Sequence, residues 1–419
     1  MCTYNSVISI RTTRIDTMIH NFLPNTPFEF GFLMRIGTAL LWAALAGEGL
    51  WHFARLPRIT GYAVTGLMLG PLGLGWFSAA DLPHFKVLID LALSLLLFEL
   101  GIHVHLRWLR DNPWVIVTSL VESALTFSAV FVTLTLMDHD ARLAAGVAAI
   151  AIGTSPAIVM RVVAEIRSQG QVTQRLFVHC ALNMTYSVVA SKLLIGMLHG
   201  AFKGDWFIAV VHPLYLLLGS LGVGAALALT FKLLRTLFAL SDEQGVAVLF
   251  GLLLLVLSFL EILSLPVVLA PLLGGMMVKF LDPRPHLWPR HFGTAGAILV
   301  IMLFVLTGLT LTWGGVAAGG GAALTLLAVR GLSKGAGVML LGPVSGLSLR
   351  QSLGLGLALI PMSAVAFLLV EDIRVLYPEF GNQVGAIVLS MLSIMELVSP
   401  AVVQWVLRFT GEAGKEGAP

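Results

Sequence analysis

The chain has 419 residues, of which 58% are hydrophobic and 11% are charged, and its formal net charge at pH 7 is +3. Soluble domains carry about 25% charged residues, so this composition excludes an ordinary soluble protein and indicates an integral membrane protein. The small, dispersed charge argues against a nucleic-acid partner. Two cysteines, Cys2 and Cys180, suggest neither a disulfide framework nor a metal site. We also expect no cofactor and no enzyme activity, because no nucleophile–base set or phosphate-binding loop is visible.

Apolar runs of helix-spanning length predict about thirteen transmembrane helices within residues 31–410. A polar N-terminal extension (1–30) precedes them, and a short tail (411–419) follows. No alternating segments of about ten residues suggest a membrane β-barrel, so we expect an all-α polytopic membrane protein. The predicted helices cover residues 31–53, 59–77, 84–106, 113–137, 142–164, 173–199, 206–231, 244–263, 265–281, 293–313, 315–342, 350–370 and 382–408.

Basic residues gather in alternate connections between these spans. One set of connections holds Arg55, Arg58, Arg107, Arg110, Arg167, Arg175, Lys232, Arg235, Arg284, Arg290, Arg350, Arg408 and Lys415. The opposite set holds little beyond Lys86, Arg142, Lys203 and Arg374. Because positive loops stay in the cytoplasm, this bias predicts an outside N-terminus and a cytoplasmic C-terminus. We expect the protein to lie in the inner (cytoplasmic) membrane of a bacterial-type cell.

The two halves of the sequence repeat one another. Leu56-Pro57 and Gly66 recur as Leu265-Pro266 and Gly275 at an offset of 209 residues, Gly101 recurs as Gly308 at 207, and Pro156 faces Pro361 at 205. Spans two to six therefore pair with spans nine to thirteen. The partners are seven helices apart, and an odd number means opposite insertion. We expect an inverted repeat with one broken helix in each half, the architecture of secondary transporters that bind substrate near the midplane of the bilayer.

The fifth span contains Gly153-Thr154-Ser155-Pro156, which should unwind the helix because proline removes a hydrogen-bond donor. The freed carbonyls and the Thr154 and Ser155 hydroxyls would be ligands for a dehydrated cation. The twelfth span repeats the interruption at Pro361. The alternative is a pair of ordinary proline kinks, which membrane helices tolerate.

The sixth span carries His179 and Asn183, four residues apart and so on one helix face. His179 can titrate in the physiological range, and it would act either as a proton carrier or as a buried packing group. Asn183 cannot titrate, but it offers both a carbonyl oxygen and an amide.

The eleventh span carries Arg330 and Lys334 in an otherwise apolar run. A buried guanidinium needs a partner, and the repeat places Arg330 opposite Glu122 of the fourth span, which makes Glu122 its candidate counter-charge. In the third span we expect only Glu99, and not Asp90, to lie deep. Glu99 would then serve either a funnel on the cytoplasmic side or a helix-end contact. Glu396 should fix the end of the last helix.

Six stretches form a specific pattern when they are taken together. They are LPRITGYAVTGLMLGP (Leu56–Pro71), LLLFELGIHVHLRWLR (Leu95–Arg110), Thr154-Ser155, the LFxxxGL stretch (Leu303–Leu309), the Arg330/Lys334 pair and the ELxxP stretch (Glu396–Pro400). With these motifs the chain resembles the monovalent cation:proton antiporters, specifically their Kef-like second branch, over nearly all of residues 31–410.

The resemblance implies a homodimeric antiporter with the sodium/hydrogen exchanger fold. Its core helices would cover about 113–199 and 315–408, and its dimerisation helices about 59–106 and 265–313. It further implies elevator-like movement of the core, a site at the crossed broken helices, and a basic residue that Arg330 resembles. Relatives carry an essential carboxylate directly after the residue that Asn183 matches. Here that position is Met184, and a thioether neither carries a proton nor balances a cation.

We therefore expect a secondary active transporter that exchanges a monovalent cation, sodium or potassium, for protons by alternating access in the lipid bilayer. His179 or Glu122 would replace the missing carboxylate. Two alternatives stay open. One is a degenerate relative that acts as a membrane sensor or partner subunit because of Met184. The other is an anion transporter of the same fold, with Arg330 and Lys334 binding the charge.

Overall fold

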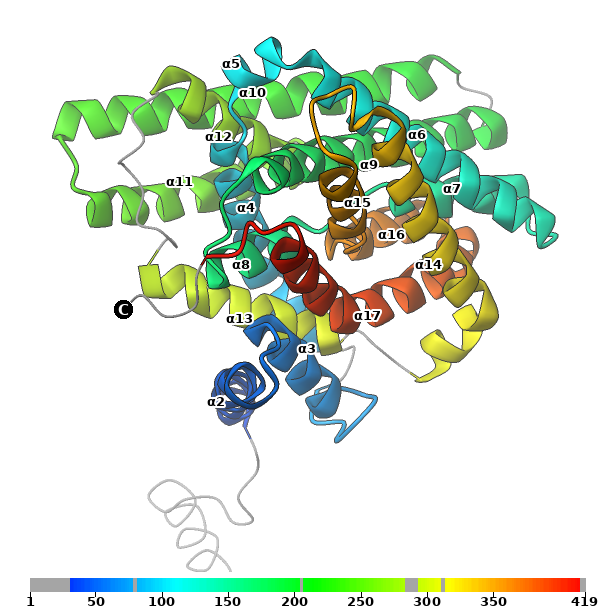
Figure 1. Cartoon of the computed structure of the whole chain (residues 1–419), viewed down its shortest axis with the longest axis horizontal. Helices are drawn as coiled ribbons and strands as arrows, with labels where there is room; N and C mark the ends of the chain where they lie inside the picture. Colours follow the sequence, from blue (N-terminus) through cyan, green and yellow to red (C-terminus); the bar gives the residue numbers. More distant parts are fainter. Residues whose placement is uncertain (1–30, 78–80, 204–205, 283–292, 310–312, 415–419) are drawn as a thin grey trace, which may run out of the picture.

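The computed structural model describes residues 31–77, 81–203, 206–282, 293–309 and 313–414, and all regular secondary structure in these ranges is helical (Figure 1). The predicted extension 1–30 and the end of the predicted tail lie outside the described residues. The first half contains α2 (Phe32–Gly49) with a π-helical turn η1 (Leu50–Ala54), α3 (Arg58–Leu69), α4 (Leu82–His103), α5 (Leu106–Asp111), α6 (Pro113–Leu136), α7 (Ala141–Ala151), α8 (Pro156–Glu165) and α9 (Gln171–Lys203). The second half contains α10 (Trp206–Phe238), α11 (Asp242–Ile262), α12 (Leu269–Leu281), α13 (Gly293–Leu309), α14 (Trp313–Leu341), α15 (Leu349–Ala358), α16 (Val365–Leu376) and α17 (Pro378–Phe409).

Each of the thirteen predicted spans corresponds to a helix, or to a pair of half-helices, in the described chain. The fifth span is the pair α7 and α8, and the twelfth is the pair α15 and α16. Within the described ranges, eight segments are long and apolar enough to cross a membrane by length and composition alone. Together these features confirm an all-α, multi-pass architecture.

Several predicted boundaries differ from those of the helices, and at two of them the local reason is plain. The second span was extended to residue 77, but α3 ends at Leu69 because Gly70 is extended and Gly75 turns with a φ of +64°. We predict that the ninth span starts at residue 265, but α12 begins at Leu269, after a non-helical stretch that contains Pro266. Proline and glycine thus shorten both repeat-related helices.

The repeat appears in how the helices pack. A Cβ atom added to Gly66 of α3 would lie 2.2 Å from the Val305 carbonyl oxygen and 3.0 Å from the Gly308 Cα of α13. A Cβ atom added to Gly275 of α12 would lie 3.1 Å from the Gly101 Cα of α4. Because Gly66 corresponds to Gly275 and Gly101 to Gly308, each of these two glycine crossings is the repeat copy of the other. The predicted inverted repeat is confirmed.

The helices form two groups. In the first, α3 packs against α13 and α2, and α12 packs against α4 and α10. In the second, α14 packs against α6, α15 and α17, while α7 packs against α6 and α9. Figure 1 shows α2, α10 and α14 toward the margins of the molecule, with the half-helices α8, α15 and α16 nearer its centre. The functional site lies in the second group, where α6, α9 and α14 surround the two breaks.

Candidate transport site

The two broken helices meet at their interruptions. The Ser155 N–H donates to the Pro361 carbonyl at 3.0 Å, and the Thr154 hydroxyl donates to the Leu359 carbonyl at 3.1 Å. Both breaks arise from the same local chemistry, because each is an apolar helix interrupted by a proline next to small hydroxyl residues. Ser155 also caps α8, since its hydroxyl accepts from the Ile158 N–H. The crossing therefore joins the first half of the chain to the second at the midpoints of their broken spans.

Arg330 holds the two breaks together. Its guanidinium, which is 0% exposed, donates to the Ala151 and Gly153 carbonyls, each at 2.7 Å. It also donates to the Ile360 carbonyl and, at 3.4 Å, to the Pro361 carbonyl. These carbonyls end α7 and α15, where the helix dipoles are negative and unpaired acceptors would be costly in lipid. One fixed fork of donors thus satisfies both half-helix ends.

The predicted pairing of Arg330 with Glu122 is wrong. Glu122 pairs instead with Lys334, whose Nζ lies 2.5 Å from Glu122 Oε1 and 3.0 Å from the Ile152 carbonyl oxygen. The physical reason is that the helix-end carbonyls already occupy the guanidinium. Lys334, one turn further along α14, is left to meet the carboxylate.

A glycine lets α14 approach α6 closely enough for this pair. A Cβ atom added to Gly337 would lie 2.5 Å from the Glu122 Cα. Gly337 follows Lys334 by three residues and lies on the same face of α14. The charged pair is therefore held at a point of direct backbone contact between the two helices.

Asn183 is the hub of a buried hydrogen-bond ring around this pair. Its amide nitrogen donates to Glu122 Oε2 at 2.8 Å and to the Thr154 hydroxyl at 3.2 Å. Its amide oxygen accepts from the Ser119 and Ser123 hydroxyls at 3.1 and 3.0 Å. Both the amide nitrogen and the amide oxygen of Asn183 have two hydrogen-bond partners, so the side chain is fixed in one orientation.

Sequence reasoning missed the polar residues on α6. Ser119 and Ser123 bind Asn183, and the Thr126 hydroxyl donates to the Glu122 backbone carbonyl at 2.8 Å. All three are less than 9% exposed. A signal was present in the sequence, because residues 119, 122, 123 and 126 follow helical spacing and form one polar stripe on an otherwise apolar helix.

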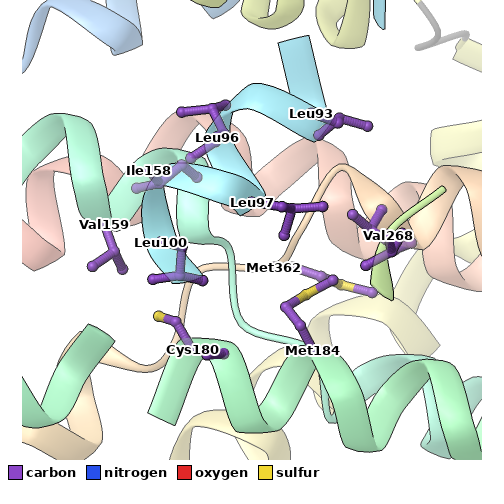
Figure 2. Close-up of a cluster of buried hydrophobic side chains, with 14 of the residues drawn as sticks. Leu93, Leu96, Leu97, Leu100, Ile158, Val159, Cys180, Met184, Val268 and Met362 are labelled. Carbon is purple, nitrogen blue, oxygen red and sulfur yellow. The ribbon is translucent and has the colours of Figure 1, made fainter. Parts of the chain in front are cut away.

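Met184 faces away from this ring. Figure 2 shows Met184 and Met362 pointing toward one another, beside Leu97 of α4 and Val268 at the start of α12. Met184 and Met362 are each 1% exposed, and Leu97 is 0% exposed. We call the side chains of Leu97, Met184, Val268 and Met362 the apolar layer. It covers the crossing on the side of α4 and α12.

Like Met184, the predicted site residues His179 and Glu99 lie outside the ring. The His179 Nδ1 donates to the Arg175 carbonyl at 2.9 Å, and no partner for its Nε2 is found among the described residues. No hydrogen bond joins the Glu99 side chain to the crossing within the described chain, and the Glu99 backbone carbonyl accepts from His103. The structure therefore brings Thr154, Asn183, Glu122, Lys334 and Arg330 together, but not His179 or Glu99.

Two expectations for other acidic residues are wrong. Asp90 is 8% exposed, although only Glu99 was expected to lie deep, because Asp90 faces a cavity between helices. Glu396 is 3% exposed and lies well inside α17 rather than at its end, because the helix continues through Pro400 to Phe409. Neighbouring helices make such an internal proline tolerable.

Among the described residues, two cavities open between the helix groups, one beside the N-terminal half of α4 and the other beside the N-terminal half of α3. The Lys86-side cavity has a volume of about 540 Å³ and is lined by charged residues of α4, α9, α11 and α16 and by apolar residues that include Val268. The Arg58-side cavity has a volume of about 340 Å³ and includes Arg58, Arg161 and Glu165 in its lining. On that side Arg58 Nη1 lies 2.9 Å from Glu165 Oε1, an ion pair between α3 and α8.

Comparison with known proteins agrees with this fold. Two solved structures of the sodium proton antiporter MjNhaP1 from Methanocaldococcus jannaschii share the fold. The first, at pH 8, has a TM-score of 0.69 and 17% identity, and covers 91% of this chain and 98% of that chain. The second, from electron microscopy, has a TM-score of 0.73 and 17% identity, and covers 92% of this chain and 100% of that chain. The family model described as the transmembrane sodium/hydrogen exchanger matches residues 38–409. Since that match spans most of the sequence, the chain belongs to the sodium/hydrogen exchanger family.

Proposed function

We propose that the chain carries out cation:proton antiport, the activity class of its family, through a single carboxylate, Glu122, that binds either Lys334 or a monovalent cation. The observation that carries this proposal is the contact of 2.5 Å between Lys334 Nζ and Glu122 Oε1, with both side chains 0% exposed. A buried charge pair at the crossing of broken helices is costly unless it has a role, and intramembrane ionisable groups mark transport paths.

The surroundings of the Lys334 ammonium supply the ligands that a dehydrated cation needs. They include the Glu122 carboxylate and the Ile152 carbonyl, with the Thr154 hydroxyl in the adjoining ring. Oxygen atoms of this kind are the hard ligands that alkali cations prefer. The ammonium therefore occupies a place in which sodium or potassium would be equally well balanced.

Exchange follows because the Lys334 ammonium and a monovalent cation compete for the Glu122 carboxylate. When a cation binds Glu122, the Lys334 ammonium loses its counter-charge, and an unpaired ammonium is strongly disfavoured in an apolar interior. Lys334 then releases its proton. When the cation leaves, Lys334 takes up a proton and returns to Glu122. One cation is thus exchanged for one proton, and the charge of the site is the same in both states.

Arg330 has a positioning role in this mechanism. Its donors are directed to carbonyls of both breaks, so it keeps Ile152 and Thr154 at the site while Lys334 and the cation alternate. The same contacts count against anion transport, because neither Arg330 nor Lys334 has its charge directed to open space. Family and fold likewise favour antiport over a relative that transports nothing.

We further propose that the helices of 113–199 and 315–408 move as a core against those of 59–106 and 265–313. The two glycine crossings support this division, since they hold α3, α4, α12 and α13 in one closely packed unit. Two copies would associate through this unit. The distribution of arginine and lysine supports a cytoplasmic Arg58 side and an inner-membrane location.

Reconstitution tests the proposal. Proteoliposomes with an internal pH dye should report proton movement when a sodium, potassium or lithium gradient is applied. Glu122→Gln should abolish the signal, whereas Glu379→Gln, an exposed acid in the first turn of α17, should leave it unchanged. Absence of a response to all three cations in the unmodified protein would contradict the proposal.

A further inference from the structure

We propose that Asp90 is a loading site, at which a hydrated monovalent cation is held in the Lys86-side cavity before it reaches Glu122. The inference rests on the proposed function, since it assigns a second station on the same path. The Lys86-side cavity is the larger of the two described above, and Asp90 lies in its wall.

Asp90 differs from the other charged residues of the cavity in having no close partner. Lys192 Nζ lies 2.7 Å from Asp372 Oδ2, and Lys86 Nζ lies 3.7 Å from Glu261 Oε1. No ion pair or hydrogen bond of the Asp90 carboxylate is found among the described residues, although Lys86, one helical turn earlier, attracts it from a longer distance. The lining thus holds two lysines and three acids, which leaves an excess of one negative charge.

Asp90 is buried, so the lack of an ion pair or hydrogen bond to its carboxylate carries a cost in free energy. Its side chain is 8% exposed and belongs to α4, which is otherwise largely apolar. An acid that is nine-tenths buried is costly unless it meets a cation or a hydrogen-bond donor. A cation in the cavity would supply the missing charge.

The cavity leads toward the transport site. Val268 belongs both to its lining and to the apolar layer, in which Figure 2 shows it beside Met184. Lys192, in the opposite wall, lies eight residues beyond Met184 on α9, about 12 Å along the helix. A cation at Asp90 would therefore lie in a cavity that borders the apolar layer, on the side of the crossing that this layer covers.

The size of the cavity indicates that the cation is held with its water. A volume of about 540 Å³ is far larger than one ion, and one carboxylate cannot replace a whole hydration shell. The dehydrated site is the ring around Glu122, whereas Asp90 raises the cation concentration at the entrance to it. The residue is thus expected to act on one side of the membrane only.

The experiment measures the cation KM separately on each side of the membrane, in right-side-out and in everted vesicles that contain the full chain. Asp90→Asn should raise the KM for sodium on the Lys86 side about five-fold, the effect of one charge contact in water. The KM on the Arg58 side and kcat should not change. Asp90→Glu should keep the normal KM, and Glu379→Gln, an exposed acid outside the cavity, is the control for general surface charge.

Chemical modification of a cysteine at position 90 separates the effect of charge on the KM from any effect of the substitution on folding. In Asp90→Cys, a methanethiosulfonate reagent with a negative charge should restore the low KM, and one with a positive charge should raise it further. The unmodified chain is the control for the reagents. An unchanged KM in Asp90→Asn, an equal rise on both sides, or the same response to both reagents would overturn the loading site. Absence of cation-coupled proton movement in the unmodified chain would instead contradict the proposed function.

Discussion

Lys334 Nζ lies 2.5 Å from Glu122 Oε1, and neither side chain is exposed to solvent. Breaking a buried pair leaves one charge without a partner and typically costs about 3–5 kcal/mol. Glu122→Gln and Lys334→Met should therefore each lower the thermal stability of the detergent-solubilised protein. The double variant should recover much of that loss, because no lone charge is left, yet it should not exchange ions. If the double variant is as unstable as the less stable single variant, the loss of stability does not come from an unpaired charge at Glu122 or Lys334.

Arg330→Lys tests the role of the guanidinium fork. A lysine keeps the charge but cannot reach the carbonyls of α7 and α15 together. We expect lower thermal stability and a loss of exchange of at least ten-fold, measured in proteoliposomes. The control is Arg161→Lys, where the described chain shows one bond, to the Gly296 carbonyl at 3.4 Å. Equal effects of the two substitutions would contradict a special role for Arg330.

Gly337→Ala tests the close approach of α14 to α6. The added Cβ would lie 2.5 Å from the Glu122 Cα, so the helices must separate and the Lys334 contact must lengthen. Overpacking of this kind costs about 1–3 kcal/mol, which thermal unfolding would detect. Gly335→Ala is the matched control on the same helix, because an added Cβ there meets nothing within 4 Å. Both variants should be stable if the approach is unimportant.

The Arg58–Glu165 pair should act as a latch that keeps the Arg58 side closed. The Arg58–Glu165 ion pair crosses between α3 and α8, whereas the pair formed by Lys192 and Asp372 joins two core helices. Glu165→Gln should favour opening of the Arg58 side, and so reduce labelling of Leu257→Cys in the Lys86-side cavity by an impermeant maleimide.

Glu48→Gln controls for the other partner of Arg58. Glu48 Oε2 lies 2.6 Å from Arg58 Nε, but α2 and α3 belong to the same helix group. Labelling in this variant should match that of the unmodified chain. The combined exchange Arg58→Glu and Glu165→Arg should restore labelling, and failure of the combined exchange would argue against a direct electrostatic latch.

Met184→Asp separates the proposed mechanism from the degenerate alternative. With Glu122 as the single shared carboxylate, exchange in the unmodified protein should be one-for-one and insensitive to membrane potential. A second carboxylate in the apolar layer adds a proton-binding group, so exchange should become sensitive to potential, as measured with valinomycin clamps. Transport that arises only after the substitution would support the non-transporting alternative.

The sequence was sufficient for the architecture and insufficient for the pairing of charges. The glycine and proline positions at offsets of 205 to 209 predicted the repeat, because backbone contacts admit few residue types. The predicted partner of Glu122 is wrong because the repeat shows which residues occupy equivalent positions in the two halves, and equivalent residues need not touch one another. Lys334 and Arg330 differ by one turn, and only the three-dimensional position of the α7 carbonyls decides which of them meets the carboxylate.

Depth was the other property that the sequence could not supply. The prediction that Asp90 does not lie deep rests on its separation of nine residues from Glu99 in the same span. The structure instead buries Asp90 in the wall of a cavity that extends between the helices. The ring around Asn183 was visible only in part, since serines and threonines in membrane helices usually bond their own backbone, as Thr118 does with the Trp114 carbonyl. The Ser119 and Ser123 hydroxyls instead donate to the Asn183 amide oxygen, which lies within hydrogen-bond distance of both.

The glycine crossings have a consequence for biosynthesis. Each joins a helix of the first half to a helix of the second. Gly308, which contacts Gly66, is synthesised 242 residues after it, and Gly275, which contacts Gly101, is synthesised 174 residues after it. At bacterial or eukaryotic rates of translation, the interval is about 10 to 50 s. During that time α3 and α4 lie in the bilayer with their glycine grooves filled by lipid. Neither half can complete its packing alone, so the nascent chain becomes stable only when the second half has been inserted.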